Sequence, residues 1–291
     1  MHREMSSEPP VPAASTWRIA RFTFREAVRK KAVLGAVLLT VLFLLLYATG
    51  LYFAFQDIEQ LGRAAAFKDF IAGQLLLLGL YAISGMAALL AIFTSVGTIA
   101  GEVEQGTLHA IVPKPLHRWE IVAGKWLGYA AMLSAYTMVT SVLAIMLVNH
   151  FGGYLPPRLL EGVALMTLET LLLLSLAVLG STFMPTVVNG IGVFMLYSTA
   201  SLGGMLEQLG SVISNDTMVN IGVVSSLVIP SDAIWRMAAG ALQPPLAMPA
   251  LAGNGLFTNL NPPSAWMLGY TVAYTLAATV LGALLFTRRD L

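Results

Sequence analysis

The sequence contains no cysteine, and only four of its 291 residues are histidine. The lack of cysteine excludes disulfide frameworks, thiolate metal ligands and cysteine nucleophiles. No histidine pairs with another at i, i+4 spacing or in an HExxH pattern, so we expect no metal centre. The histidines are His2, His109, His117 and His150.

Charged residues are also scarce. Only 11% of the residues are charged, against about 25% in an average soluble domain. Hydrophobic residues make up 57%, and the mean hydropathy is +0.77. This composition excludes water-soluble globular and disordered proteins and indicates several membrane spans. The net charge of +1 excludes a broadly basic nucleic-acid binder, so we expect membrane lipids and no nucleic acid as partners.

Six segments are apolar and long enough to cross a bilayer, which takes roughly 20 residues of helix. They are continuous apolar runs and not the alternating strands of a membrane barrel. The sequence therefore predicts an all-α, polytopic membrane protein with six transmembrane helices. The predicted spans are Ala32–Phe55, a stretch inside Phe70–Gly101, Trp126–Asn149, Gly162–Met184, Thr186–Leu206 and Ala265–Thr287.

The distribution of positive charge predicts the orientation of these spans. With the N-terminus inside, twelve of the 16 Lys and Arg residues fall in cytoplasmic segments, as the positive-inside rule requires. We therefore expect a multi-pass protein of the inner (plasma) membrane with both termini cytoplasmic. The apolar run Met218–Ile229 is too short to span, so we interpret it as a re-entrant or interfacial part of an external region, residues 207–264.

The chain before the first span divides in two. Residues 1–15 are polar and proline-rich and predict a flexible tail. Residues 16–31 predict an amphipathic interfacial helix with arginines in one stripe and aromatic residues in an adjoining one. The alternative is a positive flank that only directs insertion. The residues expected at the membrane surface are Trp17, Arg18, Arg21, Arg25 and Arg29.

The cytoplasmic connection between the second and third spans, residues 101–125, carries helix signals of its own. Thr107–Val112 predicts a short amphipathic helix, which Pro113 and Pro115 stop, and the next helix is expected to begin around Arg118.

Glycines at four-residue spacing flank this connection. Gly97 and Gly101 end the second span, and Gly124 and Gly128 begin the third. Because such spacing lets helix backbones approach closely, we expect these pairs to hold the two spans as a rigid hairpin. The alternative is that glycine is simply common in membrane helices.

The same connection resembles the signature of ABC-2 type transporter permeases. In that family the motif forms a coupling helix that contacts an ATPase subunit. The candidate ATPase-coupling residues are Glu104, Gly106, Thr107, Leu108, Ile111, Pro115 and Arg118, and Glu120, Ile121, Gly124 and Lys125 extend the match. One departure is Pro113, where the family pattern leads us to expect a small polar residue.

The resemblance implies the ABC-2 type exporter permease fold, with residues 16–31 as an elbow helix and residues 32–291 as the transmembrane domain. It also implies a non-enzymatic subunit that forms a homodimer or a heterodimer with a related permease. A separate ABC ATPase would bind the ATP. In agreement, the sequence has no GxxxxGK[ST] phosphate loop. The Gly124-Lys125 pair does not belong to one, because Trp126 stands where the loop requires Ser or Thr.

The segment Ile229–Met237 resembles a Pro-x-Asp-x-x-aromatic-Arg pattern in permeases linked to multicopper-enzyme maturation. Asp232 and Arg236 within it are four residues apart and would pair in a helix.

Two polar residues inside predicted spans, Glu169 and Asn189, are candidates for a translocation path. A buried ionisable group in a span is expected to face protein or a water-filled space. The alternative for both residues is hydrogen-bonded packing between helices.

Two other classes of function stay open at this stage. A secondary transporter would show inverted repeats and several buried charges. A non-transporting scaffold or signalling subunit would also dock a soluble partner. The cargo of a transporter is not readable, because the spans carry no charge pattern specific to one substrate.

Overall fold

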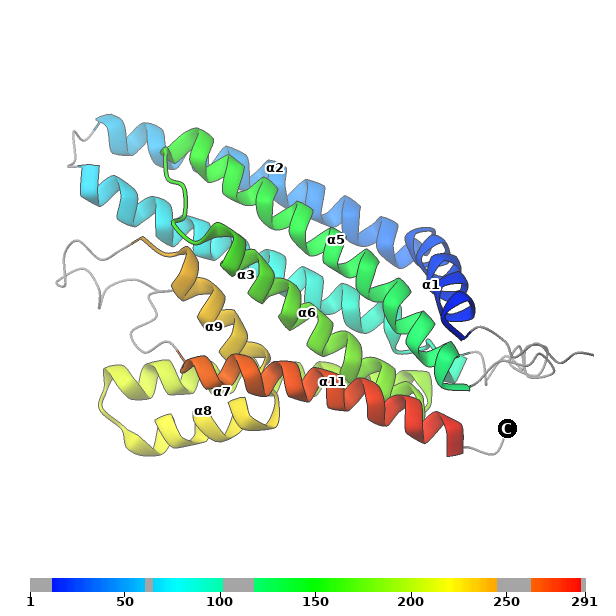
Figure 1. Ribbon diagram of the computed structural model, residues 1–291. Helices are drawn as coiled ribbons and strands as arrows, with labels where there is room; N and C mark the ends of the chain where they lie inside the picture. The colour runs from blue at the N-terminus through cyan, green and yellow to red at the C-terminus, as the bar shows by residue number, and fades with distance from the viewer. Residues whose placement is uncertain (1–11, 61–64, 102–117, 245–262, 289–291) are drawn as a thin grey trace, which may run out of the picture.

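The computed structural model describes residues 12–60, 65–101, 118–244 and 263–288, and these residues form helices joined by turns and short connections (Figure 1). The helices are α1 (Pro12–Val28), α2 (Lys31–Gln60), α3 (Ala65–Ser95), α5 (Arg118–Gly152), α6 (Leu159–Ser181), α7 (Thr186–Val212), α8 (Asp216–Val228), α9 (Ser231–Leu242) and α11 (Ala265–Arg288).

Six of these helices are long and apolar enough to cross a membrane: α2, α3, α5, α6, α7 and α11. Each contains most of one predicted span, so the prediction of an all-α polytopic fold is confirmed. The helices extend beyond the predicted spans at several ends. For example, α5 begins at Arg118 and not at Trp126, and α7 continues past Leu206 to Val212. Helix α1 begins at Pro12 and ends at Val28, so it is displaced toward the N-terminus from the expected 16–31.

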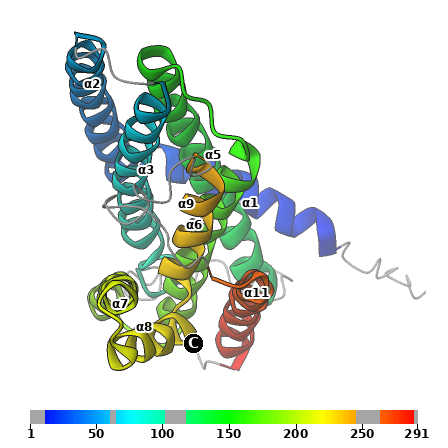
Figure 2. The same cartoon turned by 90° about the vertical axis from the view of Figure 1, so that its left-hand side faces the viewer.

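Helix α6 is the most buried of the six spans, and α2 is the least buried. Helix α6 contacts α3, α5, α7, α9 and α11, and Figure 2 shows it near the middle of the bundle with α2, α7 and α8 at the periphery. Met166 of α6 joins Leu76 of α3 and Ile234 of α9 in a core where each is at most 1% exposed. On α2, Leu38 and Leu46 point outward, which is the arrangement expected in lipid.

Helices α8 and α9 are short and are bent by 104° relative to each other. The break falls at Ile229–Pro230, because proline disfavours the helical conformation of the residue before it. Ile229 is accordingly extended, with φ −141° and ψ 109°. In Figure 1, α8 enters from the end where α7 finishes and α9 runs back toward that end. This path fits the re-entrant interpretation of the Met218–Ile229 run.

Helix α9 packs inside the bundle, although it belongs to the region that was expected to be external, residues 207–264. All but two of its 12 residues are buried, and it packs against α6. The residues from Met237 to Leu242 belong to this helix. Its small side chains, such as Ala233 and Ala238, let it approach α6 and fill the core.

The glycines of α5 contact α1 and not the second span. A Cβ added at Gly128 would lie 2.7 Å from the backbone oxygen of Ala20, and one at Gly124 would lie 2.7 Å from Cβ of Ile19. The prediction that Gly124 and Gly128 pack against the second span is therefore wrong, because they pack against α1. The α5 glycine face is occupied by α1, whose small residues Ala20 and Ala27 are buried.

The two glycines that follow α3, Gly97 and Gly101, face the beginning of α7. A Cβ added at Gly97 would lie 3.2 Å from Cγ2 of Thr186, and one at Gly101 would lie 4.0 Å from its Oγ1. Helices α3 and α5 still pack side by side.

We predict that Gly128→Ala destabilises the protein, because the added methyl group would meet a backbone oxygen. The expected loss is about 1–3 kcal/mol, the usual cost of overpacking, measured as a lower thermal denaturation midpoint in detergent. Gly85→Ala in α3 is the matched control, since no atom lies within 4 Å of its added Cβ. Equal losses in the two variants would contradict the close packing of α1 on α5.

Candidate functional site

Most of the candidate coupling residues lie outside the described part of the chain. These are Glu104, Gly106, Thr107, Leu108, Ile111 and Pro115. Arg118 is the first residue of α5, and its side chain also lies outside the described residues. The structure does describe the two flanks of the segment, namely the end of α3 up to Gly101 and the beginning of α5.

Two lysines bind the carbonyl oxygens at the end of α3. Lys30, between α1 and α2, donates its Nζ to the oxygen of Thr94 at 3.4 Å and to the hydroxyl of Tyr129 in α5. Lys125 of α5 donates to the oxygen of Thr98 at 2.8 Å. The last carbonyls of a helix have no partner within the helix, and basic side chains satisfy them. The α1–α2 junction, α3 and α5 are thereby joined at one point.

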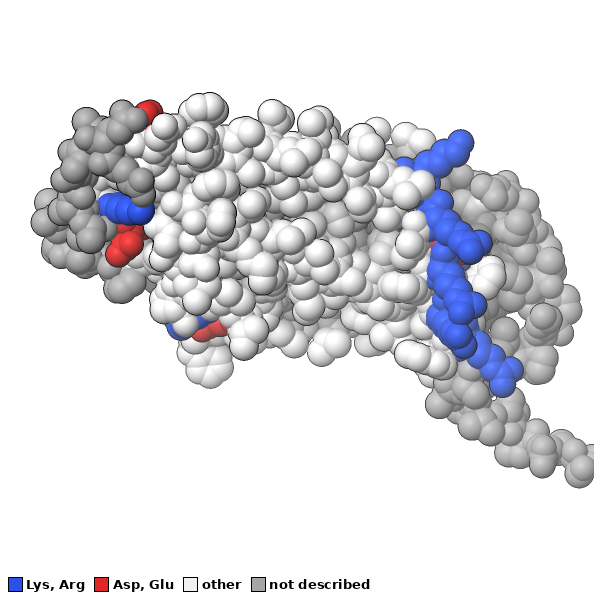
Figure 3. All heavy atoms as spheres, turned by 90° about the horizontal axis from the view of Figure 1, so that it is seen from above, with Lys and Arg blue, Asp and Glu red and all other residues white. Residues whose placement is uncertain are grey.

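Helix α1 places its predicted surface residues on one exposed face. Trp17 is 69% exposed, and the four arginines Arg18, Arg21, Arg25 and Arg29 are exposed as well. The opposite face buries Ala20, Thr23 and Ala27 against the rest of the protein. Figure 3 shows Lys and Arg gathered in a band at one end of the molecule, beside a long surface without charge.

Glu169 lies in α6 near the centre of the bundle. It is 3% exposed, and its Oε2 accepts a hydrogen bond from Oγ of Ser84 in α3 at 2.7 Å. Ser84 thus gives the carboxylate a polar partner between two spans, where an isolated charge would be costly.

Asn189 lies in α7, close to the break at Pro185. Its side-chain amide donates to the oxygens of Val96, directly after α3, at 3.0 Å and Ala177 in α6 at 2.8 Å. A Cβ at Gly180 would collide with its Oδ1, so this glycine makes room for the amide. Asn189 therefore ties α7 to both α3 and α6. Neither Asn189 nor Glu169 lines the cavities described here and below.

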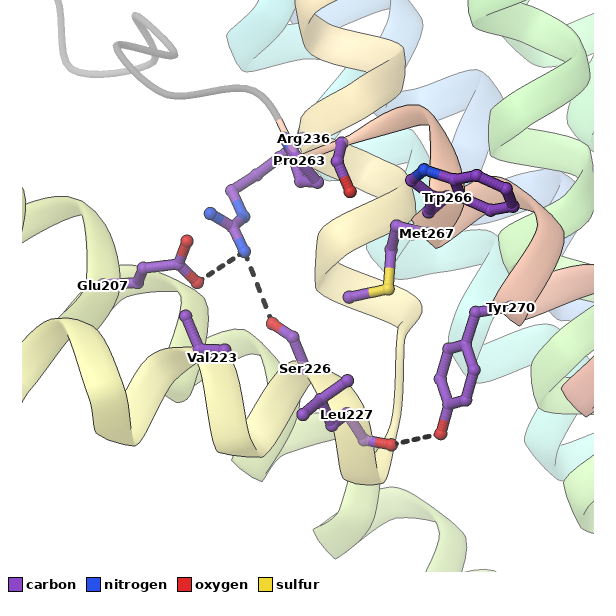
Figure 4. A pocket seen from close by; sticks show the side chains of 10 residues that line it. Glu207, Val223, Ser226, Leu227, Arg236, Pro263, Trp266, Met267 and Tyr270 are labelled. Carbon is purple, nitrogen blue, oxygen red and sulfur yellow. Dashed lines mark hydrogen bonds and ion pairs between the residues drawn. The ribbon is translucent and has the colours of Figure 1, made fainter.

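A cavity of about 440 Å³ lies between α7, α8, α9 and α11 (Figure 4). One wall is polar and includes Glu207, Ser226 and Arg236, whereas Trp266 and Met267 contribute apolar surface. Tyr270 of α11 donates its hydroxyl to the oxygen of Leu227 at 2.6 Å. This bond links α11 to the bent α8–α9 pair.

Arg236 is the centre of the polar wall. It contacts Oε2 of Glu207 at 2.7 Å, Oγ of Ser226 at 3.3 Å and Oδ2 of Asp232 at 2.9 Å. The pairing with Asp232 follows the four-residue spacing within α9. Glu207 lies 29 residues earlier on α7, and no pattern in the sequence connects it with Arg236. Two carboxylates surround one guanidinium, so the cluster carries a formal charge of −1.

Among the described residues, no group of three or more His, Asp or Glu side chains could hold a metal ion. The described structure thus offers two polar features beyond the buried Glu169 and Asn189. One is the joint at the end of α3, and the other is the Arg236 cluster with its cavity at the opposite end of the bundle.

These features define a multi-pass helical membrane protein with a hydrogen-bonded joint at one end and a cavity beside the bent α8–α9 pair at the other. The model of the family described as ABC-2 family transporter protein matches residues 17–291, and the chain belongs to this family. It is therefore a membrane component of an ABC transporter, a permease rather than the ATPase, and the family implies an ABC ATPase as its partner.

The narrower resemblance to permeases of multicopper-enzyme maturation is not supported by the family match. No curated protein sequence matches the chain. In the structure, the Ile229–Met237 pattern has a local explanation: Pro230 breaks the helix, and Asp232 and Arg236 form an internal ion pair.

We predict that Arg236→Gln is strongly destabilising, because it leaves Glu207 and Asp232 close together without a cation. Breaking a buried ion pair from one side costs about 3–5 kcal/mol, measurable in unfolding titrations with SDS. Arg158→Gln is the matched control, since the Arg158–Glu161 pair has side chains 59% and 50% exposed and should contribute less than about 1 kcal/mol. Similar losses in both variants would refute the structural role of the cluster.

Proposed function

We propose that this chain is the permease subunit of an exporter and that a separate ABC ATPase docks on residues 101–125. The observation that carries the proposal is the joint at the end of α3. Residues 102–117 connect α3 to α5, and both flanks of this connection are held to each other and to α1. A force applied to the segment would therefore reach α1, α3 and α5 together.

The contacts of α3 give this force a route into the bundle. Asn189 hydrogen-bonds to both Val96 and Ala177, so a shift of α3 acts on α6 and α7. Glu169 bonds to Ser84 farther along the same two spans, α6 and α3. We propose that Glu169 and Asn189 border the path that opens when these spans move, and that the Arg236 cluster holds its outer end closed.

The proposed orientation has the positive end of the molecule in the cytoplasm. Figure 1 places α1 and the C-terminal end of α11 at the same end of the bundle, and Figure 3 shows the band of Lys and Arg there. The positive-inside rule assigns such an end to the cytoplasm of the inner membrane. Both termini are then cytoplasmic, and the α8–α9 pair opens to the outside.

Six spans form half of the usual twelve, so we propose a homodimer or a heterodimer with a related permease. Each permease would bind one ATPase. In the alternative of a non-transporting scaffold, the ATPase or another soluble partner would bind without moving the outer end of the bundle.

We predict that Arg118→Glu uncouples the ATPase from the permease without unfolding it, and that Leu108→Ala and Gly106→Val act likewise. In reconstituted complexes, ATP should change the labelling rate of a cysteine at the outer end, and this change should fall about tenfold, as for the loss of one charge-assisted contact. Arg158→Glu, a charge reversal at the other end, is the control. A normal response in an Arg118→Glu variant that still binds its ATPase would count against the proposal.

We also predict the sidedness of the coupling segment. Because the chain has no cysteine, Thr107→Cys and Leu160→Cys each introduce a single reactive thiol. A membrane-impermeant maleimide should label Thr107→Cys only in inverted vesicles and Leu160→Cys, at a position 83% exposed, only in right-side-out vesicles. Labelling of Thr107→Cys from the outside would exclude an ATPase docking there.

A further inference from the structure

A second cavity, of about 220 Å³, lies at the joint between α1, α3 and α5. About 10–15 Å³ of such space is enough for one water molecule, so the cavity has room for a polyatomic group. The polar side chains that line it are Thr23, Glu26, Lys30, Thr98, Lys125 and Tyr129.

Two side chains that line the cavity, Lys30 and Thr98, have hydrogen-bond donors that no described residue accepts. The ammonium group of Lys30 carries three protons, and its two acceptors are the oxygen of Thr94 and the hydroxyl of Tyr129. The hydroxyl of Thr98 is buried, and among the described residues it has no hydrogen-bond partner. The residue itself is 4% exposed. A buried polar atom of this kind calls for a partner that the polypeptide does not supply.

The charges favour an anion as that partner. Among the described side chains that line the cavity, Lys30 and Lys125 carry positive charges and Glu26 carries a negative charge. Glu26 is exposed, so solvent screens it more than it screens the partly buried lysines. The neighbouring arginines of α1 are exposed on the same end of the molecule and add to the positive potential (Figure 3).

We infer that this cavity binds a phosphate group, and that the phosphate belongs to the headgroup of an anionic phospholipid. Basic pockets between membrane helices bind such headgroups. The position supports a lipid source, because the cavity lies beside the amphipathic α1 and at the beginning of the apolar part of α5. The bound phosphate accepts hydrogen bonds from Lys30 and Thr98, and it thereby bridges the α1–α2 junction and the turn after α3.

The inference is tested on the full-length purified permease in a neutral detergent. Native mass spectrometry measures the binding of phosphatidylglycerol and phosphatidylcholine, with inorganic phosphate as a competitor. We expect one phosphatidylglycerol to bind in preference to phosphatidylcholine, and millimolar inorganic phosphate not to displace it. No ATPase is needed, so the result is independent of the proposed coupling.

Two variants test the residues. Lys30→Gln should weaken phosphatidylglycerol binding by about ten- to a hundredfold, as for the loss of a charged hydrogen bond, and Thr98→Val by about three- to tenfold. Thr98→Val keeps both lysine contacts with α3, so it remains informative if Lys30→Gln loosens the fold. Arg21→Gln removes an exposed charge from α1 and should lower the affinity less than Thr98→Val does.

Each other outcome overturns part or all of the inference. Competition by inorganic phosphate would replace the lipid with free phosphate as the ligand. Equal binding of phosphatidylglycerol and phosphatidylcholine would show that the cavity does not select an anionic headgroup. Binding by Thr98→Val and Lys30→Gln that matches the wild type, or a larger effect of Arg21→Gln, would assign the lipid preference to the surface of α1 and reject the cavity.

Discussion

Hydrocarbon offers no hydrogen-bond partner, so each polar group within the bundle must find one inside the protein. This constraint explains why the polar contacts run between helices that are distant in sequence. Lys30 and Lys125 take carbonyl oxygens at the end of α3. The side-chain amide of Asn189 donates to one carbonyl oxygen just after α3 and to one in α6. Arg236 forms ion pairs with both Glu207 and Asp232. The polar residues thus determine which of the otherwise similar apolar helices are tied together.

The two ends of the molecule differ in chemistry. At the positive end, glycines on α5 allow α1 to approach the backbone, and lysines join both to α3. At the other end, Arg236 of α9 pairs with Asp232 of the same helix and with Glu207 of α7, beside a cavity of about 440 Å³. In the proposed exporter, the permease receives movement at one end and releases cargo at the other. The tightly packed joint suits the first task, and a cavity bordered by an ion-pair cluster suits the second.

Features with a local cause could be predicted from the sequence. The six spans follow from apolar length, and the break before Pro230 follows from proline sterics. Helix α9 was missed, because its 12 residues include Asp232 and Arg236 and are too few to span. The predicted partner of the α5 glycines was also incorrect. Glycine spacing indicates that another backbone approaches closely, but it does not indicate which helix that backbone belongs to. The pairing of Glu207 with Arg236 could not be predicted either, because it depends on the bend between α8 and α9 that brings α9 back to α7.

The sequence by itself predicted an all-α membrane protein with six candidate spans, and its resemblance to a family of permeases implied an ATPase partner. These properties depend on composition, on run length and on a contiguous motif, all of which are local. Only the tertiary structure decided that α1 docks on α5, that α9 enters the core, and that Lys30, Thr98 and Lys125 line one cavity. Apolar helices pack almost equally well in many arrangements, and only the three-dimensional match of small residues and polar partners selects one of them.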